Sequence, residues 1–200
     1  MASKIKVDQI QTGDGTGTIA LQNQLSGMTT ASLPALGAAQ MPAGSVLDIG
    51  WVQTNFNSTL SIQTTSFVDV TDLSLTMTPK SSSSQYLVQA NIHHYIDNHA
   101  ADNWSSTDFR IRKVVGGTDT LVYESFRDDG NGHGYTAGAF VTHINDRYMW
   151  VTPIAYLDTH GASSGTVRYY IQAKSKVSGY SINFNSTYGK STLYMTEIQR

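Results

Sequence analysis

Apolar and polar residues alternate with a period of two along most of the chain from about Val46 onward. The apolar members of the successive series are Leu47, Ile49 and Trp51; Leu73, Leu75 and Met77; Tyr86, Val88, Ala90 and Ile92; Phe109 and Ile111; Leu121 and Tyr123; Met149 and Val151; Val167, Tyr169, Ile171 and Ala173; and Leu193 and Met195. A period of two places the members of each series on one side of an extended segment. The pattern therefore predicts half-buried strands, about eight to ten of them over residues 46–200.

A pair of glycines marks the turn between two of these strands. Gly116 and Gly117 stand between Val115 and Thr118, and glycine adopts at low cost the positive φ angles of a tight two-residue hairpin. We therefore expect a β-hairpin over residues 107–125. The number and spacing of the strands, with no helical pattern between them, predict an all-β fold, an antiparallel jelly-roll-like β-sandwich.

Residues 1–44 lack this sustained alternation. Residues 1–27 are short strand-like patches around a turn cluster at residues 12–17, too short to bury a core of their own. Residues 28–44 are rich in Ala, Gly, Thr and Pro, which is typical of an extended linker. The sequence thus predicts an extended N-terminal arm over residues 1–27, a linker over residues 28–44 and a β-sandwich head domain over residues 45–200.

The composition narrows the class of protein. Charged residues make up 14% of the chain and the formal net charge is -2, which lacks the basic excess of a nucleic-acid-binding protein. Ser and Thr together make up 45 residues, whereas Glu occurs only twice, as expected of strands rather than surface helices. There is no Cys for disulfides or thiolate chemistry, and no apolar run long enough to span a bilayer. We expect neither nucleic acid nor membrane as a partner.

The densest group of ionisable residues lies between His93 and Asp102. Imidazole and carboxylate groups can bind zinc or iron, but His93 and His94 point to opposite faces if they lie on a strand. His94 falls in an apolar series, so we expect it to be a hydrogen-bonded histidine of the core or of an interface. His99 and Asp102 are expected in the following loop. We therefore predict no metal site and no cofactor.

Catalytic arrangements have little support in the sequence. The glycine-rich stretch at residues 128–134 lacks the ligand spacing of a calcium loop. A glycosidase needs two carboxylates beside its substrate, and the only glutamates are Glu124 and Glu197, the second next to the C-terminus. The nucleophile motif G-x-S-x-G does not occur. We expect a protein that is not an enzyme.

Aromatic and amide side chains in the predicted loops are the remaining candidates for binding. Tyr and Trp beside Asn and Asp can form stacking platforms for sugars or anchors for protein partners. The candidate receptor-contact residues are Asn98, Asp102, Asn103, Trp104, Asp128, Asp129, Asn131 and Tyr135. The alternative is that most of them are core or subunit contacts.

Three stretches of the chain together resemble a known group of proteins. They are residues 2–10 (ASKIKVDQI) with residues 13–19 (GDGTGTI), residues 41–47 with residues 66–84, and residues 191–198 (STLYMTEI). These stretches resemble tail-fibre-like and other structural proteins of tailed bacteriophages, notably marine and cyanobacterial phages, with a C-terminal β-sandwich domain. The resemblance implies a homotrimeric, non-enzymatic component of the virion.

Two functional hypotheses follow. In the first, the chain is a tail-fibre subunit whose arm anchors it to tail or baseplate proteins and whose head contacts a glycan of the host surface. In the second, it is a capsid-decorating or head-fibre protein that strengthens the shell. Both hypotheses place the protein in the virion, assembled in the host cytoplasm; a polysaccharide-cleaving tailspike is a third, enzymatic hypothesis. In either of the first two cases the anchors of the arm are its apolar residues, which are Ile5, Val7, Ile10, Ile19 and Leu21.

Overall fold

The computed structural model describes residues 37–54, 60–97, 105–124, 140–141, 148–175, 178, 181–184 and 189–200. The chain divides after residue 36, and every described element belongs to residues 37–200. The predicted arm, its five apolar anchors and the larger part of the predicted linker lie outside the described residues.

The described residues form one short 3-10 helix and eleven strands, with no helix that could reach across a bilayer. The elements are η3 (Ala38–Gln40), β1 (Val46–Gln53), β2 (Leu60–Ile62), β3 (Val68–Met77), β4 (Gln85–Asp97), β5 (Ser105–Val115), β6 (Thr118–Glu124), β7 (Phe140–Val141), β8 (Tyr148–Thr159), β9 (Val167–Ser175), β10 (Ser181–Phe184) and β11 (Thr192–Ile198). The number exceeds the eight to ten expected from the sequence because β2, β7 and β10 are only two to four residues long.

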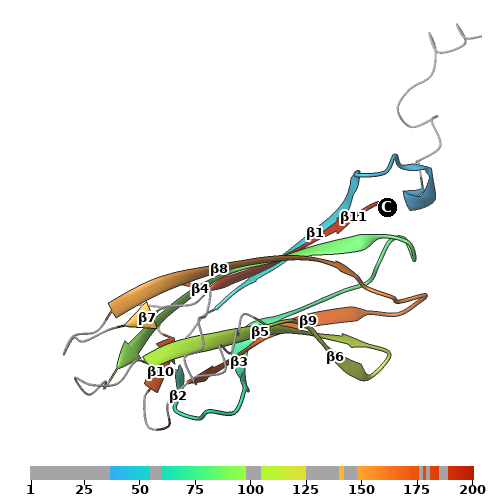
Figure 1. The fold of residues 1–200 in the computed structure, drawn as a ribbon. Coiled ribbons are helices and arrows are strands. Elements are labelled where there is room, and N and C mark those ends of the chain that lie inside the picture. Colours follow the sequence, from blue (N-terminus) through green and yellow to red (C-terminus); the bar gives the residue numbers. More distant parts are fainter. Residues whose placement is uncertain are drawn as a thin grey trace, which may run out of the picture. The chain divides into compact units, whose positions relative to one another are not determined.

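The strands form two antiparallel sheets packed as two layers (Figure 1). One sheet pairs β1 with β11, β11 with β4 and β4 with β8, while β10 pairs with the last residues of β4 and β2 pairs with β10. The other runs β3–β9–β5–β6, with β7 on the end of β5. Consecutive long strands such as β3, β4 and β5, or β8 and β9, lie in opposite sheets, as in a jelly-roll-like β-sandwich. The all-β fold class expected from the sequence is confirmed.

The core lies between the two sheets and is built from the inward positions of the long strands. In β4 and β9 the predicted series are fully inward, with Tyr86, Val88, Ile92, Tyr169 and Ile171 buried. Because β-strand side chains alternate between faces, these residues leave every second position for the outer surface. A cross-sheet contact closes the core at one side. There Asp158 of β8 accepts hydrogen bonds from Lys113 Nζ (2.7 Å) and the Tyr169 hydroxyl (2.6 Å) of the facing sheet.

β1 places Ile49 and Trp51, two residues of its predicted apolar series, on the side opposite to the core. The series Leu47, Ile49 and Trp51 predicts a half-buried strand, yet Ile49 and Trp51 are each 60% exposed. The inward position between them is Gly50, and a Cβ atom there would lie 2.7 Å from Met77 Sδ of β3. The facing sheet is therefore close at this point, and a larger inward residue than Gly50 would have to displace the side chain of Met77.

The predicted hairpin is present. β5 and β6 pair in antiparallel register and are joined by Gly116 and Gly117, with φ angles of 56° and 82°. Two successive positive φ angles are the geometry of a type I′ turn, which matches the right-handed twist of the strands it joins. The glycine pair in the sequence was thus a sufficient signal for this element.

Candidate functional site

The eight candidate receptor-contact residues, between Asn98 and Tyr135, all lie outside the described residues. The same holds for His99, so the predicted absence of a metal site in that loop stays a prediction. Within the described part of the chain, no group of three or more His, Cys, Asp or Glu residues is arranged to hold a metal ion.

His94 is a core residue, as its place in the apolar series predicts. It is 3% exposed, its Nδ1 lies 3.2 Å from the carbonyl oxygen of Ile92, and its ring meets Phe109 edge-on at 5.0 Å. Burial lowers the pKa of His94 to about 4 because the charged imidazolium loses its hydration. The ring is therefore neutral at physiological pH and belongs to the packing of the core.

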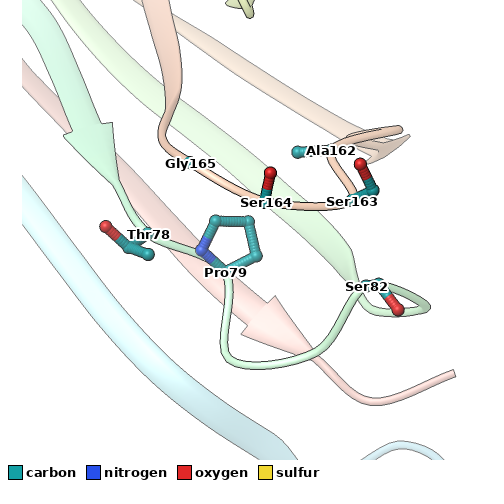
Figure 2. A pocket seen from close by; sticks show the side chains of 7 residues that line it. All are labelled: Thr78, Pro79, Ser82, Ala162, Ser163, Ser164 and Gly165. Carbon is teal, nitrogen blue, oxygen red and sulfur yellow. The ribbon is translucent and has the colours of Figure 1, made fainter.

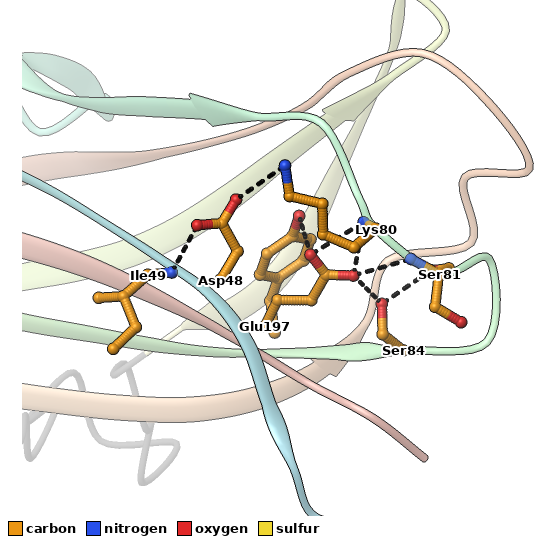
Figure 3. A network of polar contacts seen from close by, with 7 residues as sticks. Asp48, Ile49, Lys80, Ser81, Ser84 and Glu197 are labelled. Carbon is orange, nitrogen blue, oxygen red and sulfur yellow. Dashed lines mark hydrogen bonds and ion pairs between the residues drawn. The ribbon is translucent and has the colours of Figure 1, made fainter. Parts of the chain in front are cut away.

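The main polar structure of the sandwich is a buried carboxylate at the end of the last strand (Figure 3). Glu197 of β11 is fully buried and accepts hydrogen bonds from the backbone N–H groups of Lys80 (2.8 Å) and Ser81 (3.1 Å). The hydroxyl of Ser84 donates to it at 2.5 Å and that of Tyr86 at 3.5 Å. We call these five residues the Glu197 network. It fixes the loop between β3 and β4 to the C-terminal strand, because each donor lies on or next to that loop.

Tyr86 remains protonated within this network. Burial and the negative charge of Glu197 both raise the pKa of its phenol far above the usual value. The phenol is therefore a permanent donor toward the carboxylate.

Ser84 of the network and the neighbouring His160 are not arranged as a nucleophile and its base. His160 Nδ1 accepts a hydrogen bond from the N–H of Ala162 (2.9 Å), which leaves the ring proton on Nε2. Nε2 then donates toward Ser84 Oγ or the carbonyl oxygen of Ser81, both at 3.2 Å, and cannot accept the serine proton. Ser84 is also fully buried, so a substrate cannot reach it.

The Glu197 network supports a polar end of the sandwich, where two loops form a small cavity (Figure 2). The cavity of about 100 Å³ is lined by Thr78, Pro79 and Ser82 on one side and by residues 162–165 on the other. A second, shallow cavity of about 300 Å³ shares Ser164 and Gly165 with it and extends to Gly116 and Arg168. Hydroxyl groups of Thr78, Ser82, Ser163 and Ser164 line the smaller cavity, whereas the larger one has both polar and apolar lining.

The outer surface of the β1–β11–β4–β8 sheet is the most distinctive surface of the molecule. Outward positions are those that alternate with the buried ones. They are Val46, Ile49, Trp51 and Gln53 on β1; Thr192, Tyr194, Thr196 and Ile198 on β11; Gln85, Leu87, Gln89, Asn91 and His93 on β4; and Val151, Pro153, Ala155, Leu157 and Thr159 on β8. We call this surface the uncharged face, since none of these residues is Asp, Glu, Lys or Arg.

Large apolar side chains gather on the uncharged face. Among the described residues eight large apolar side chains are exposed, and all except Val68 and Leu121 lie on it. Trp51 and Tyr194 stack with their ring centroids 6.4 Å apart. Exposed apolar patches of this kind mark interaction sites on soluble proteins.

The outer surface of the other sheet has the opposite character. It carries Asp69 on β3, Arg110 and Arg112 on β5, Asp119 and Glu124 on β6, and Arg168 and Lys174 on β9, while Asp108 of β5 lies on the same side of the sheet but is buried. We call it the charged face.

The charged groups of this face are paired across its strands. Arg112 Nε lies 3.0 Å from Asp119, and Lys174 lies 3.4 Å from Asp108. Although desolvation opposes it, hydrogen bonds from Tyr170 and Arg112 hold the pKa of Asp119 below its usual value. Among the outward strand residues that the structure describes, Asp, Glu, Lys and Arg are thus concentrated on the charged face and absent from the uncharged face.

Sequence reasoning missed both the Glu197 network and the uncharged face. A signal for the network was present, because Glu197 continues the inward series of Leu193 and Met195 and a carboxylate at an inward position must find donors. A signal for the face was also present in β8, where Val151, Pro153, Ala155 and Leu157 occupy alternate positions without a charge. Recognising the face required knowledge of which strands are neighbours.

Comparison with known proteins identifies no family. No protein-family model matches the chain, and no curated protein matches it in sequence. One solved structure with some similarity is a chain described as "Crystal structure of the T13 IBDV viral particle reveals a missing link in icosahedral viruses evolution". The similarity has a TM-score of 0.40 and 11% sequence identity, and it covers 84% of this chain and 40% of that chain. This chain therefore spans less than half of the chain it is compared with, and a similarity this distant carries no functional argument.

Proposed function

We propose that the protein is a non-enzymatic structural protein of a bacteriophage virion. In this proposal it is a homotrimeric, tail-fibre-like subunit whose residues 1–27 anchor it to other virion proteins. Its jelly-roll head projects from the anchor and contacts a glycan of the host surface. The proposal combines the resemblance of the sequence to phage structural proteins with the surfaces of the folded head.

The observation that carries the proposal is the uncharged face. A surface four strands wide, with Ile49, Trp51 and Leu157 each at least half exposed, is costly to leave in water. Such a surface is expected of a subunit that works by assembling with other chains. A monomeric protein that acts alone gains nothing from exposing it.

The polar end of the sandwich supports the part of the proposal that concerns a glycan. Ser82, Ser163 and Ser164 present hydroxyl groups around the smaller cavity, and Arg168 borders the larger one. The Glu197 network holds the underlying loop in place, so little conformational entropy is lost when a ligand binds there. The predicted receptor-contact residues remain a separate candidate for this contact, because β4 ends at Asp97 and β6 ends at Glu124, both away from these cavities.

A capsid-decorating protein is the second candidate, and the breadth of the uncharged face favours it. A broad sheet surface without charge can lie against a capsid shell as well as against another fibre subunit. The two candidates differ in the position of the head on the particle.

Immunogold electron microscopy of purified particles tests the proposal, with antibodies raised against residues 46–200. Label on the tail or baseplate is expected for the fibre subunit, and label over the capsid surface instead identifies the decoration protein. Particles that carry no label, and contain no peptides of the chain by mass spectrometry, contradict both candidates.

A further inference from the structure

We propose that the uncharged face is the surface through which copies of this chain contact one another. The inference rests on the proposed function, because it names the partner that the exposed sheet takes in the assembled subunit. The rows of residues that cross the sheet carry the argument. The central row runs from Trp51 through Tyr194 and Gln89 to Ala155, one residue from each of the four strands.

The distribution of charge selects a second copy as the partner. In a symmetric homo-oligomer, a charge close to the rotation axis lies near the same charge on its copies, and the repulsion costs free energy. A face that meets its own copies is therefore expected to exclude Asp, Glu, Lys and Arg, which is what the uncharged face does. On the charged face, by contrast, any Arg or Asp close to the axis would lie near the same charge on its copies.

The polar groups on the face are suited to the same partner. Gln85, Gln89 and Asn91 each offer both donors and acceptors, and so do the hydroxyls of the threonines between them. Gln85 Nε2 donates to Thr159 Oγ1 at 3.1 Å across β4 and β8, so such groups already pair with one another on this surface. Groups that both donate and accept can satisfy identical groups on another copy, whereas carboxylates or ammonium groups cannot.

The size of the face fits an interface between subunits. With strands about 4.8 Å apart and outward residues about 6.7 Å apart along each strand, the face covers roughly 500 Å² of flat area. Because side chains protrude from the sheet, the accessible surface of the face is larger than this projected area. It approaches the roughly 800 Å² per partner that a stable interface buries. A bilayer is a poorer match, because membrane-surface binding uses Lys and Arg around the apolar residues and this face has neither.

A charge placed at the centre of the face tests the inference. In the full-length protein, Gln89→Lys puts an ammonium group between Tyr194 and Ala155, where the copies would meet. We expect the oligomer of Gln89→Lys to dissociate at protein concentrations at least about tenfold higher than the oligomer of the unaltered protein, as measured by light scattering across a dilution series. The matched control is Leu121→Lys, a half-exposed position on the sheet with the charged face, which is expected to leave the dissociation unchanged. Circular dichroism must show that both variants keep their strands.

A second measurement detects the contact directly and does not depend on a change in the stability of the oligomer. Because the chain has no Cys, Gln89→Cys and Leu121→Cys each introduce a single thiol. A short bifunctional maleimide is expected to join Gln89→Cys into a species of twice 21.8 kDa and to leave Leu121→Cys as single chains. The inference is overturned if Gln89→Cys gives no such species. It is also overturned if Gln89→Lys keeps the oligomer of the unaltered protein, or if the unaltered protein is itself monomeric.

These outcomes are separate from the test of the proposed function. If the Gln89 variants behave as expected but purified particles lack the protein, the self-contact stands and the virion role fails. If the protein is found in particles but Gln89→Lys keeps its full oligomer, the virion role stands and the self-contact fails.

Discussion

Glu197 is the residue that ties the end of the sandwich together. A fully buried carboxylate is tolerated only where donors replace its lost hydration. Here the N–H groups of Lys80 and Ser81 and the hydroxyls of Ser84 and Tyr86 replace it. The residue therefore has a structural role, because its oxygens are occupied by the protein's own donors.

Replacing this carboxylate by an amide should destabilise the fold. Glu197→Gln keeps the shape of the side chain but turns one acceptor oxygen into a donor facing other donors, which costs about 2–3 kcal/mol of unfolding free energy. Urea unfolding followed by circular dichroism measures the loss. The control is Glu124→Gln on the charged face, expected to change stability by less than about 0.5 kcal/mol. Equal, small effects of the two substitutions would mean that the network does not stabilise the head.

His94 gives the head a specific dependence on pH. Its pKa is about 4 in the fold, below the ordinary value of 6.5, so the unfolded chain binds more protons between these values. The contribution of the neutral ring to the free energy of unfolding is therefore complete above pH 6.5. It is lost as the pH falls toward 4, and the total loss is about 3 kcal/mol.

The measurement compares unfolding free energies at pH 7 and pH 4.5 for the unaltered protein, His94→Leu and His93→Gln. We expect His94→Leu to lose a smaller part of its stability on acidification than the unaltered protein, whatever its stability at pH 7. His93→Gln should keep the full loss, since His93 lies on the other side of β4 and is only half-buried. An unchanged pH dependence in His94→Leu would rule out His94 as its source.

At the scale of elements, the hairpin between β5 and β6 depends on the backbone of its two turn residues. Gly116 has a φ of 56°, and a Cβ atom there would meet no atom within 4 Å. Any cost of a substitution therefore comes from backbone conformation alone. Valine resists a positive φ, whereas asparagine adopts it readily.

We expect Gly116→Val to lower the unfolding free energy by about 1–2 kcal/mol. Gly116→Asn forms the Asn-Gly pair favoured in type I′ turns and is expected to cost less than about 0.5 kcal/mol. Thermal unfolding of the two variants provides the comparison. If both lose the same stability, the turn does not have the type I′ backbone geometry.

Strand existence could be predicted from the sequence much better than strand orientation. The alternation places β4, β5 and β9 correctly, with their apolar series inward, because those strands are covered on one side by the second sheet. It misleads in β1 and β8, where Trp51 and Val151 point outward. Periodicity shows that one side of a strand is apolar but cannot tell a core from a contact surface, since both are made of the same side chains.

At the scale of the whole molecule, the pairing order β1–β11–β4–β8 creates the uncharged face. These strands come from both ends and the middle of the head, so no local stretch of sequence contains the face. Composition alone indicated that unusually few residues are charged, and the fold shows on which sheet the charged residues lie. The sandwich class was predictable from strand number and spacing, whereas the identity of neighbouring strands was not.

The division of the chain after residue 36 leads to a prediction about the two parts. Deleting residues 1–36 retains every described strand and the Glu197 network, so the shortened chain is expected to keep its β-sheet circular dichroism and cooperative unfolding. In the proposed function the same deletion abolishes incorporation into particles, because it removes the apolar anchors Ile5, Val7, Ile10, Ile19 and Leu21. A shortened chain that is unfolded contradicts the division, and one that still enters particles normally shifts attachment to the head.

The mass of the full-length protein in solution tests the central claim, self-assembly of a structural subunit, most directly. Light scattering on the unaltered chain at micromolar concentration is predicted to give about three times 21.8 kDa. Three copies that meet through the uncharged face would remove Trp51, Ile49 and Leu157 from water. A clean mass of 21.8 kDa at that concentration would contradict the account, because the face would then be exposed to water in the working protein.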